Sequence, residues 1–277
     1  MNHGAYDIDG PEGAPAIVFV HGTRLTGTVW RAQMDDLRDT YRVVALDLPG
    51  HGRSADRAFT VADAADEVAH AIEVVAGGHA VVVGLSLGGY VAMDLAARRP
   101  ELVRGLVVSG ATTEPVGLLA TPYLALAWIL ERFDGPALDA LNAWFFRARF
   151  PPAIAEPIIA AGFWSAGGAQ SIRALIGQRF VPRLAAYRGP SLILNGAWDV
   201  LFRLTVDAFA RSAHDVRRVR LGRATHLANL DQPRAFSYAV RRFMEALPAP
   251  DPVRPARGVS LPQEGPVLDL ADPSRVP

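Results

Sequence analysis

The composition of this 277-residue chain excludes several kinds of chemistry before any motif is considered. Half of the residues are hydrophobic and a fifth are charged, which is ordinary for a globular chain long enough to bury its own core. The absence of cysteine excludes a thiol nucleophile and a thiolate metal site. All 28 basic residues are arginine, which excludes Schiff-base lysine chemistry, and 28 acidic residues balance them, so the net charge does not favour nucleic acid or an anionic membrane.

No segment is typical of a secretory leader or a membrane span. Residues 1–7 lack the charged start and apolar stretch of a signal peptide. The longest apolar run, residues 116–130, contains Pro122 and is shorter than the roughly 20 residues of a spanning helix. We therefore expect a cytoplasmic protein that acts on a small molecule, without a membrane or nucleic-acid partner. The oligomeric state is left open.

Short apolar runs recur along the chain and predict β-strands. Six of them lie at residues 16–20, 43–46, 80–84, 105–109, 191–195 and 216–221. The first five are almost continuously hydrophobic, which is typical of parallel strands covered on both faces. The sixth alternates valine or leucine with arginine, as an outer strand with one wet face does.

Helical spacing separates these runs. It occupies residues 30–40, 61–76, 89–99 and 232–247. Strands that alternate with helices predict an α/β fold with a doubly wound, mostly parallel sheet. Residues 1–111 and 188–247 would form this core.

Two segments depart from the alternation. Residues 112–187 show no strand, are rich in leucine, alanine and aromatic residues, and are cut into about four helices at Gly135-Pro136, Pro151-Pro152 and Gly167-Gly168. This insert precedes the penultimate strand and is predicted to be a helical lid, although ordinary packing of helices on the sheet is the alternative. Residues 248–277 hold eight prolines and are expected to be a disordered tail.

The sharpest chemical signal is a Gly-x-Ser-x-Gly motif centred on Ser86. A buried strand runs into Gly84-Leu85-Ser86-Leu87-Gly88 and continues directly into a helix. A nucleophilic serine must stand on a tight, strained turn, and side chains two residues to either side would collide with it. We predict that Ser86 is a nucleophile.

A serine hydroxyl needs a base, and the base needs a carboxylate that fixes its tautomer. Of seven histidines, His226 alone lies in the loop between the last strand and the last helix, so we predict it to be the base. Asp199 follows a strand at the edge where such sheets place their sites and is the favoured acid. Glu114, after the preceding strand, is its rival. Asp231 is expected to cap the final helix.

Over residues 16–247 the chain resembles the α/β-hydrolase superfamily. His21-Gly22-Thr23 is similar to the oxyanion turn of that family, residues 47–54 (Asp-Leu-Pro-Gly-His-Gly-Arg-Ser) resemble its second characteristic loop, and the order Ser86, Asp199, His226 is the family's order. The resemblance implies that the backbone N–H groups of Thr23 and Leu87 hold the oxyanion. It implies structural roles for His21 and His51.

Fold alone does not select the reaction. Ser86 disfavours the dehalogenases and epoxide hydrolases of this superfamily, which use aspartate, and the lack of lysine disfavours the plant-type hydroxynitrile lyases. Perhydrolases usually have an aromatic residue where Thr23 stands. The C–C bond hydrolases of aromatic-ring degradation typically have glycines where Thr23-Arg24-Leu25 stand and a tryptophan where Leu227 stands, so that resemblance is weaker.

The favoured function is therefore hydrolysis of a carboxylic ester, lactone or thioester with an apolar part, through an acyl-enzyme on Ser86. Alternatives are a C–C hydrolase, lyase or cyclase that uses the same three residues, and a non-catalytic binding module. We expect no cofactor and no metal. Arg24 is either a partner for a substrate carboxylate or a solvated side chain. The residues predicted to bind substrate are Arg24, Trp128, Trp144, Phe145, Trp164, Trp198 and Leu227.

Overall fold

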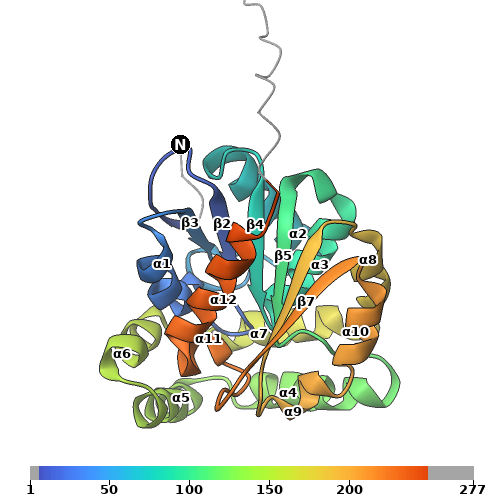
Figure 1. The fold of residues 1–277 in the computed structure, drawn as a ribbon. Helices are drawn as coiled ribbons and strands as arrows, with labels where there is room; N and C mark the ends of the chain where they lie inside the picture. Colours follow the sequence, from blue (N-terminus) through green and yellow to red (C-terminus); the bar gives the residue numbers. More distant parts are fainter. Residues whose placement is uncertain (1–5, 249–277) are drawn as a thin grey trace, which may run out of the picture. The chain divides into compact units, whose positions relative to one another are not determined.

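A seven-stranded sheet runs through residues 6–248, the part of the chain that the computed structural model describes (Figure 1). Its strands are β1 (Tyr6–Asp9), β2 (Ala16–Val20), β3 (Arg42–Leu46), β4 (Ala80–Leu85), β5 (Val103–Ser109), β6 (Pro190–Gly196) and β7 (Asp215–Leu221). They follow the order β1-β3-β2-β4-β5-β6-β7, and all neighbours are parallel except β1 and β3. The predicted fold class is confirmed. The expected tail lies, from residue 249 on, outside the described residues.

The six predicted strands are all present, and β1 is a seventh strand that the apolar runs do not predict. This strand has only four residues, Tyr-Asp-Ile-Asp, and pairs antiparallel with β3 at the edge of the sheet. Its two aspartates point toward solvent, so it lacks the continuous apolar run that marks the inner strands. The opposite edge strand, β7, is mostly exposed, as its alternating arginines predict.

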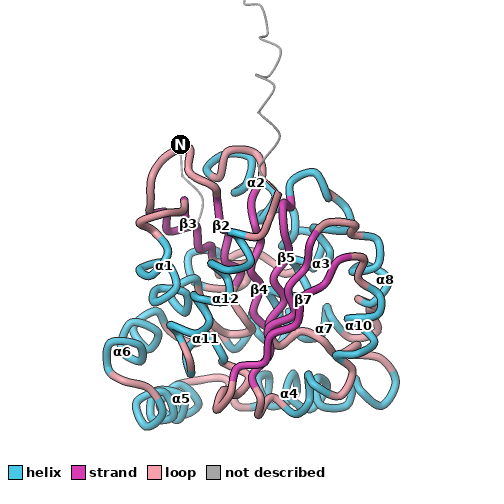
Figure 2. Tube along the Cα trace, in the orientation of Figure 1, coloured by secondary structure: helices cyan, strands magenta, loops and turns pink. Residues whose placement is uncertain are grey.

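Twelve α-helices surround the sheet within the described range. They are α1 (Arg31–Leu37), α2 (Val61–Val75), α3 (Leu87–Arg98), α4 (Thr121–Arg132), α5 (Pro136–Arg149), α6 (Pro152–Ala161), α7 (Ser165–Leu175), α8 (Val181–Ala186), α9 (Val200–Arg203), α10 (Val206–Ser212), α11 (Ala228–Asp231) and α12 (Pro233–Glu245). Short 3-10 turns are η1 (Gly27–Trp30), η2 (Gly52–Ser54), η3 (Pro100–Leu102) and η4 (Gly117–Ala120). Figure 2 shows the strands as a central layer among these helices.

The buried core lies in two layers, one on each face of the sheet. Side chains alternate along each strand, so Val18 and Val20 of β2 face the layer that contains α2 and α3. Ile17 and Phe19 face the other layer, where α12 packs with α1. Burial on both faces explains why the inner strands have nearly continuous apolar sequences.

The strand order reverses between β2 and β4, which lie side by side in parallel register with Val20 opposite Gly84. In open α/β sheets the crevice at the carboxyl ends of strands on either side of such a reversal is where ligands bind. The turn that begins at His21 follows β2, and Ser86 follows β4. The topology therefore brings these two loops together.

Between β5 and β6 the chain forms only helices, from η4 to α8, and α4, α5 and α7 lie at the carboxyl end of the sheet, at the bottom of Figure 1. Pro136 and Pro152 begin α5 and α6 as the sequence predicts. Gly167-Gly168, in contrast, does not separate two helices but lies inside α7. A Cβ atom on Gly167 would stand 1.9 Å from the carbonyl oxygen of Gly50, so this glycine pair serves close packing.

The described residues up to Leu247, including these helices, form one compact unit. Within residues 6–248, none of the helices combines the length and the apolar character that crossing a bilayer requires.

Candidate active site

Ser86 lies on a sharp turn between β4 and α3. Its backbone has φ 51° and ψ −115°, a conformation that non-glycine residues rarely adopt. A Cβ atom on Gly84 would be 2.3 Å from the Gly88 carbonyl oxygen, and one on Gly88 would be 2.1 Å from the Val20 carbonyl oxygen. The strand–turn–helix context expected of the motif is therefore present, and both glycines are required by close backbone contacts.

His226 and Asp199 are hydrogen-bonded across two neighbouring loops. Asp199 follows β6 and is buried, and its Oδ2 lies 2.9 Å from Nδ1 of His226, which follows β7. The carboxylate accepts a hydrogen bond from the Nδ1–H group, so the lone pair of the imidazole is on Nε2. Gly110 leaves room for this pair, because a Cβ atom there would stand 2.8 Å from Cε1 and 2.9 Å from Nδ1 of His226.

Phe202 holds the imidazole from a second side. Its ring stacks on His226 with 4.6 Å between ring centroids and 25° between planes. The carbonyl oxygen of Phe202 accepts a hydrogen bond from Thr112, whose hydroxyl also accepts one from Asn195. Asn195 in turn accepts the backbone N–H of Gly110 at 2.9 Å. The loops after β5 and β6 are thereby fixed to each other around the histidine.

The turn after β2 orients the Thr23 N–H through a buried histidine. The Leu48 N–H donates to Nε2 of His21 at 2.9 Å, so the ring proton is on Nδ1 and is donated to the Gly22 carbonyl oxygen at 2.8 Å. The Gly22 C=O and the Thr23 N–H belong to one trans peptide and point in opposite directions. The Thr23 N–H therefore points away from the His21 ring.

His51 fixes the next peptide in the same way. Its Nε2 accepts the Arg24 N–H at 3.1 Å, and its Nδ1 donates to the Pro49 carbonyl oxygen at 3.0 Å. The first bond needs a neutral imidazole, because only an unprotonated Nε2 can accept, and burial lowers the pKa of His51 to about 3. Burial also lowers the pKa of His21. These contacts agree with the structural roles that the resemblance implies for both histidines.

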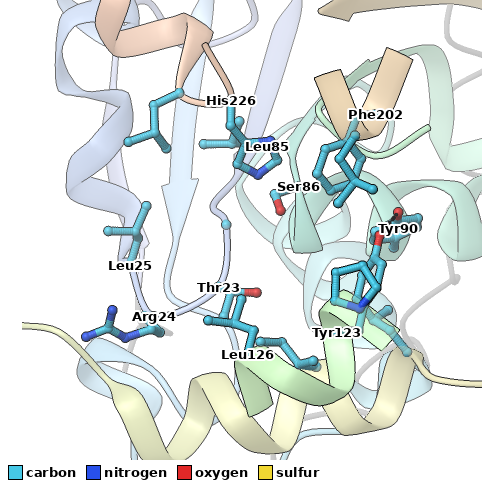
Figure 3. Close-up of a pocket in the computed structure, with 16 residues that line it drawn as sticks. Thr23, Arg24, Leu25, Leu85, Ser86, Tyr90, Tyr123, Leu126, Phe202 and His226 are labelled. Atoms are coloured by element: carbon cyan, nitrogen blue, oxygen red, sulfur yellow. Dashed lines mark hydrogen bonds between the residues drawn. The ribbon is translucent and has the colours of Figure 1, made fainter. Parts of the chain in front are cut away.

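Arg24 links the same turn to the helices that cover it. Its backbone has φ 67°, and its carbonyl oxygen accepts a hydrogen bond from the backbone N–H of Trp164 at 3.0 Å. Its Nη1 donates to Asn142 Oδ1 in α5 at 3.2 Å. The guanidinium lies over the Phe163 ring and is directed away from Ser86 (Figure 3). Its Nε and Nη2 are buried without a hydrogen-bond partner among the described residues.

Two tyrosines form a directed hydrogen-bond chain beside the site. Tyr90 Oη donates to the Thr113 carbonyl oxygen at 2.5 Å, because a carbonyl can only accept. Tyr90 must therefore accept from Tyr123 Oη, which is 2.7 Å away. Burial raises the pKa of Tyr90 well above its ordinary value and that of Tyr123 to about 12, so both phenols keep their protons.

A cavity of about 370 Å³ joins these groups. Figure 3 shows Ser86, His226 and Phe202 on one side of it and Thr23 with Leu126 on the other. Its size and mostly apolar walls are those of a small-molecule site. The lining residues are Gly22, Thr23, Arg24, Leu25, Leu85, Ser86, Tyr90, Pro122, Tyr123, Leu126, Ile172, Leu175, Leu201, Phe202, His226 and Leu227.

Of the residues predicted to bind substrate, only Arg24 and Leu227 line this cavity. Five others are placed elsewhere: Trp128, Trp144, Phe145, Trp164 and Trp198. Trp164 stands against a separate hollow near Asp47, and the other four side chains are largely exposed. The five residues were predicted from their aromatic character alone, whereas α4 turns Tyr123 and Leu126 toward the cavity. The position of Tyr90 could have been predicted from the sequence, because it follows Ser86 by one helical turn and so lies on the same side of α3.

The structure also places the two other carboxylates that the sequence singled out. Glu114 accepts the backbone N–H groups of Phe180 and Val181 at 3.0 and 2.9 Å, so it binds the start of α8 and not His226. Asp231 does not cap α12. Its Oδ2 accepts hydrogen bonds from both the backbone N–H and the hydroxyl of Thr225 at 2.6 Å, and these bonds fix the loop that carries His226.

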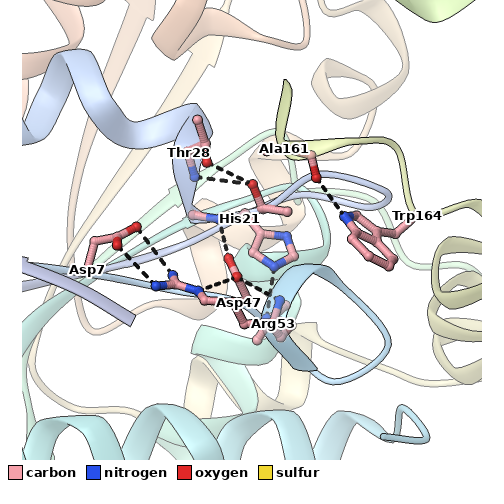
Figure 4. Close-up of polar contacts among 10 residues, drawn as sticks. Asp7, His21, Thr28, Asp47, Arg53, Ala161 and Trp164 are labelled. Carbon is pink, nitrogen blue, oxygen red and sulfur yellow. Dashed lines mark hydrogen bonds and ion pairs between the residues drawn. The ribbon is translucent and has the colours of Figure 1, made fainter. Parts of the chain in front are cut away.

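Asp47 anchors the second characteristic loop (Figure 4). Its carboxylate accepts the Gly27 N–H at 2.8 Å and both the backbone N–H and Nε of Arg53. Burial opposes the ionised form, but these hydrogen bonds outweigh it and lower the pKa of Asp47. Arg53 also pairs with Asp7 of β1. No group of His, Asp and Glu in the described residues is arranged to hold a metal ion.

Comparison with known proteins identifies the family. The alpha/beta hydrolase family profile matches residues 17–239, and this chain belongs to that family. A 2-(acetamidomethylene)succinate hydrolase from Mesorhizobium japonicum is 29% identical over 255 residues, covering 84% of this chain and 88% of the relative.

Two further relatives are named as esterases. A pimeloyl-[acyl-carrier protein] methyl ester esterase from Yersinia pseudotuberculosis is 41% identical over 97 residues, which cover 35% of this chain and 36% of that protein. A thermophilic esterase from Thermogutta terrifontis, solved with malate bound, superimposes with a TM-score of 0.74 at 25% identity, covering 88% of this chain and 93% of that one. These similarities extend to the fold and to hydrolases as a class.

Proposed function

We propose that this protein is a serine hydrolase that cleaves a carboxylic ester, lactone or thioester with an apolar part through an acyl-enzyme on Ser86. The observation that carries the proposal is the arrangement of Ser86 on its strained turn in one cavity with His226, whose Nδ1 is held by Asp199 at 2.9 Å. The apolar cavity walls favour a substrate with an apolar part.

In the proposed reaction, Nε2 of His226 takes the Ser86 hydroxyl proton while Oγ attacks the carbonyl carbon. The negative charge that forms on the carbonyl oxygen is stabilised by the N–H groups of Thr23 and Leu87, each worth about 2.7–4 kcal/mol in the transition state. The C–O or C–S bond breaks, and the leaving group takes the proton from His226. A water molecule, activated by the same nitrogen, then releases the acid and restores Ser86.

We also propose that residues 112–187 act as a lid over this cavity. Pro122, Tyr123 and Leu126 come from α4, and Ile172 and Leu175 come from α7, so this segment supplies one wall. Because α4 and α7 pack against each other, movement of one would move the other. The helical segment would then select the substrate, while the loops after β2, β4, β6 and β7 perform the chemistry.

The surroundings of Arg24 favour a substrate that also carries a carboxylate. Arg24 is one of the cavity-lining residues, and its Nε and Nη2 are buried without a hydrogen-bond partner among the described residues, so a substrate carboxylate could pair with them if the side chain turned toward the cavity. The Mesorhizobium japonicum relative is named for a succinate. The chemistry at Ser86 would be unchanged.

Hydrolysis of p-nitrophenyl esters from acetate to decanoate, together with the monosuccinate ester, tests the proposal. We expect turnover by the wild type and a fall in kcat of at least about 10⁴-fold for Ser86→Ala, because the nucleophile is lost. The chain length with the highest kcat/KM reports the apolar pocket. A preference for succinate over butyrate that Arg24→Gln removes would support the carboxylate contact.

Ser191→Ala is a matched control. Ser191 is buried in β6 and its hydroxyl has no hydrogen-bond partner within residues 6–248, so removing that hydroxyl should leave activity unchanged. Activity that survived in folded Ser86→Ala would contradict the proposed nucleophile. No turnover of any ester by the wild type would instead favour C–C cleavage or a binding role, which product analysis and ligand titration separate.

A further inference from the structure

The outer surfaces of α4 and α5 expose an unusual amount of apolar side chain. We use the name apolar face for six residues of α4, its C-cap and α5 that are 43–65% exposed: Leu124, Trp128, Phe133, Leu141, Trp144 and Phe145. Scattered apolar residues are normal on a protein surface, but a concentration on two consecutive helices is typical of an interaction site.

The helix α4 has apolar residues on all sides. Only Tyr123, Ala127 and Leu130 are buried in it, and these lie on one side, at spacings of four and three residues. Leu124 and Trp128 lie on one flank of that buried stripe and are exposed. A helix that is hydrophobic all round is normally buried all round, so α4 is only partly covered by its own chain.

The helix α5 carries its apolar stripe on the outside. Phe146 is its one buried residue, whereas Leu141, Trp144, Phe145 and Ala148 follow the i, i+3, i+4, i+7 spacing on the opposite side. That spacing defines a single helix face. An amphipathic helix gains stability by covering such a face, and nothing in the described chain covers this one.

The size of the apolar face matches that of a dimer interface. With 150–250 Å² per aromatic side chain, the four aromatic residues alone expose roughly 300–550 Å² of apolar surface, and Leu124 and Leu141 add to it. A standard interface buries about 800 Å² per partner, of which roughly 60% is apolar, or about 500 Å². The apolar face is thus large enough for a stable pair.

The charges around the apolar face favour a second copy over a bilayer. Residues 121–149 carry three acidic and three basic residues, and Glu131 and Arg147 are already paired with Arg173 and Glu156. Surface-binding membrane helices instead carry an excess of lysine and arginine on their polar side. A surface without net charge is compatible with its own copy in a two-fold contact.

We propose that the exposed apolar residues of α4 and α5 act together as one contact surface, and that this protein forms a symmetric homodimer in which the apolar face of one protomer packs on the same face of its partner. Pro122 and Leu126 of α4 are exposed and also line the cavity, so the interface would lie beside the cavity mouth. A partner against α4 would hold the helix that forms one wall of the pocket. The proposal concerns association and does not depend on the proposed ester hydrolysis.

Sedimentation velocity of the full chain, from about 1 to 100 μM, tests the dimer. We expect the wild type to sediment as a pair of 29.7 kDa protomers and Trp144→Glu combined with Leu141→Glu to raise the dimer Kd at least 100-fold, because both changes place charge at the centre of the contact. Tyr238→Glu is the matched control. Tyr238 is an equally exposed aromatic residue on α12, so that variant should remain dimeric.

Single cysteines give a second readout, because the chain has none of its own. Near a two-fold axis a residue meets its own counterpart, so at least one of Leu141→Cys, Trp144→Cys and Ala148→Cys should form an intermolecular disulfide, and Tyr238→Cys should not. A wild type that stays monomeric at 100 μM would overturn the proposal. So would a dimer that the double variant leaves intact, or a monomer that binds phosphatidylcholine vesicles through these residues.

Discussion

Three non-glycine residues in the described chain have positive φ, namely Arg24, Ser86 and Arg223. Each lies in a loop that directly follows a strand at the candidate site: Arg24 after β2, Ser86 after β4, and Arg223 between β7 and His226. Such conformations cost on the order of 1–3 kcal/mol each and persist where the surroundings enforce them. Backbone strain is thus concentrated where the proposed reaction takes place, and the bonds that enforce it, such as that of the Arg24 N–H to His51, belong to the site.

At the residue scale, Gly110 is expected to be essential for the position of His226. A methyl group there would stand within 3 Å of two imidazole atoms, so Gly110→Ala should displace the ring. A misplacement of about 1 Å lowers kcat by roughly 100-fold. Kinetics on the best ester measure the effect, and urea unfolding measures the accompanying loss of stability.

Gly117→Ala controls for backbone strain alone. Gly117 has φ 55°, close to the 59° of Gly110, but a Cβ atom there meets nothing within 4 Å. Its alanine variant should lose a similar amount of stability from the backbone and keep its kcat. Equal losses of kcat in the two variants would show that the contact with His226 is not the cause.

At the element scale, the site depends on loops that the sheet brings together. β2 and β4 are neighbours although α1, β3 and α2 separate them in sequence, and this places the turn after β2 beside the turn that carries Ser86. β6 and β7 are likewise parallel neighbours, so Asp199 and His226 emerge at adjacent positions. Glu114 has a different role, because its carboxylate accepts hydrogen bonds from the backbone N–H groups at the start of α8.

Asp199 and Glu114 should therefore respond differently to substitution. Asp199→Asn is expected to lower kcat by about 10⁴-fold, because the histidine loses the partner that fixes its tautomer. Glu114→Gln should leave kcat near wild type and reduce the free energy of unfolding by about 1 kcal/mol through weaker binding of the α8 N–H groups. Kinetics and urea unfolding on both variants test this, and the reverse pattern would assign the acid to Glu114.

At the scale of the whole molecule, two buried neutral histidines couple folding to pH. The pKa of His51 is about 3 in the folded chain, against an ordinary value of 6.5 in the unfolded chain. Below pH 6.5, His51 binds a proton in the unfolded chain but stays neutral in the folded chain. The contribution of His51 is therefore fully present above pH 6.5 and is lost as pH falls toward 3, at about 1.4 kcal/mol per pH unit.

Urea unfolding between pH 4.5 and 7.5 measures this loss. His51→Gln should be less stable at pH 7.5, since the Arg24 N–H loses its acceptor, but its stability should fall less steeply below pH 6.5. His70→Gln, at an exposed position on α2, should keep the wild-type slope. A slope unchanged in His51→Gln would exclude this histidine as the titrating group.

Much of the fold and the central residues of the site could be predicted from the sequence, because their signals are local. Continuous apolar runs mark strands buried on both faces, and each of the six predicted strands is found within two residues of its expected bounds. The glycines around Ser86 are required by contacts within one turn and the adjacent strand, so the motif itself encodes the geometry. The position of His226 follows from its place after the last strand.

The tertiary structure decided everything that depends on contacts between distant segments. It joined Asp199 and not Glu114 to His226, paired Arg24 with Asn142 118 residues away, and turned Tyr123 and Leu126 toward the cavity. The same packing left Trp128 and Trp144 on the surface, where their size alone suggested a pocket. Periodicity identifies the apolar faces of a helix, but which face meets the cavity, the sheet or a second molecule is set by the energy of packing against partners that the local sequence does not specify.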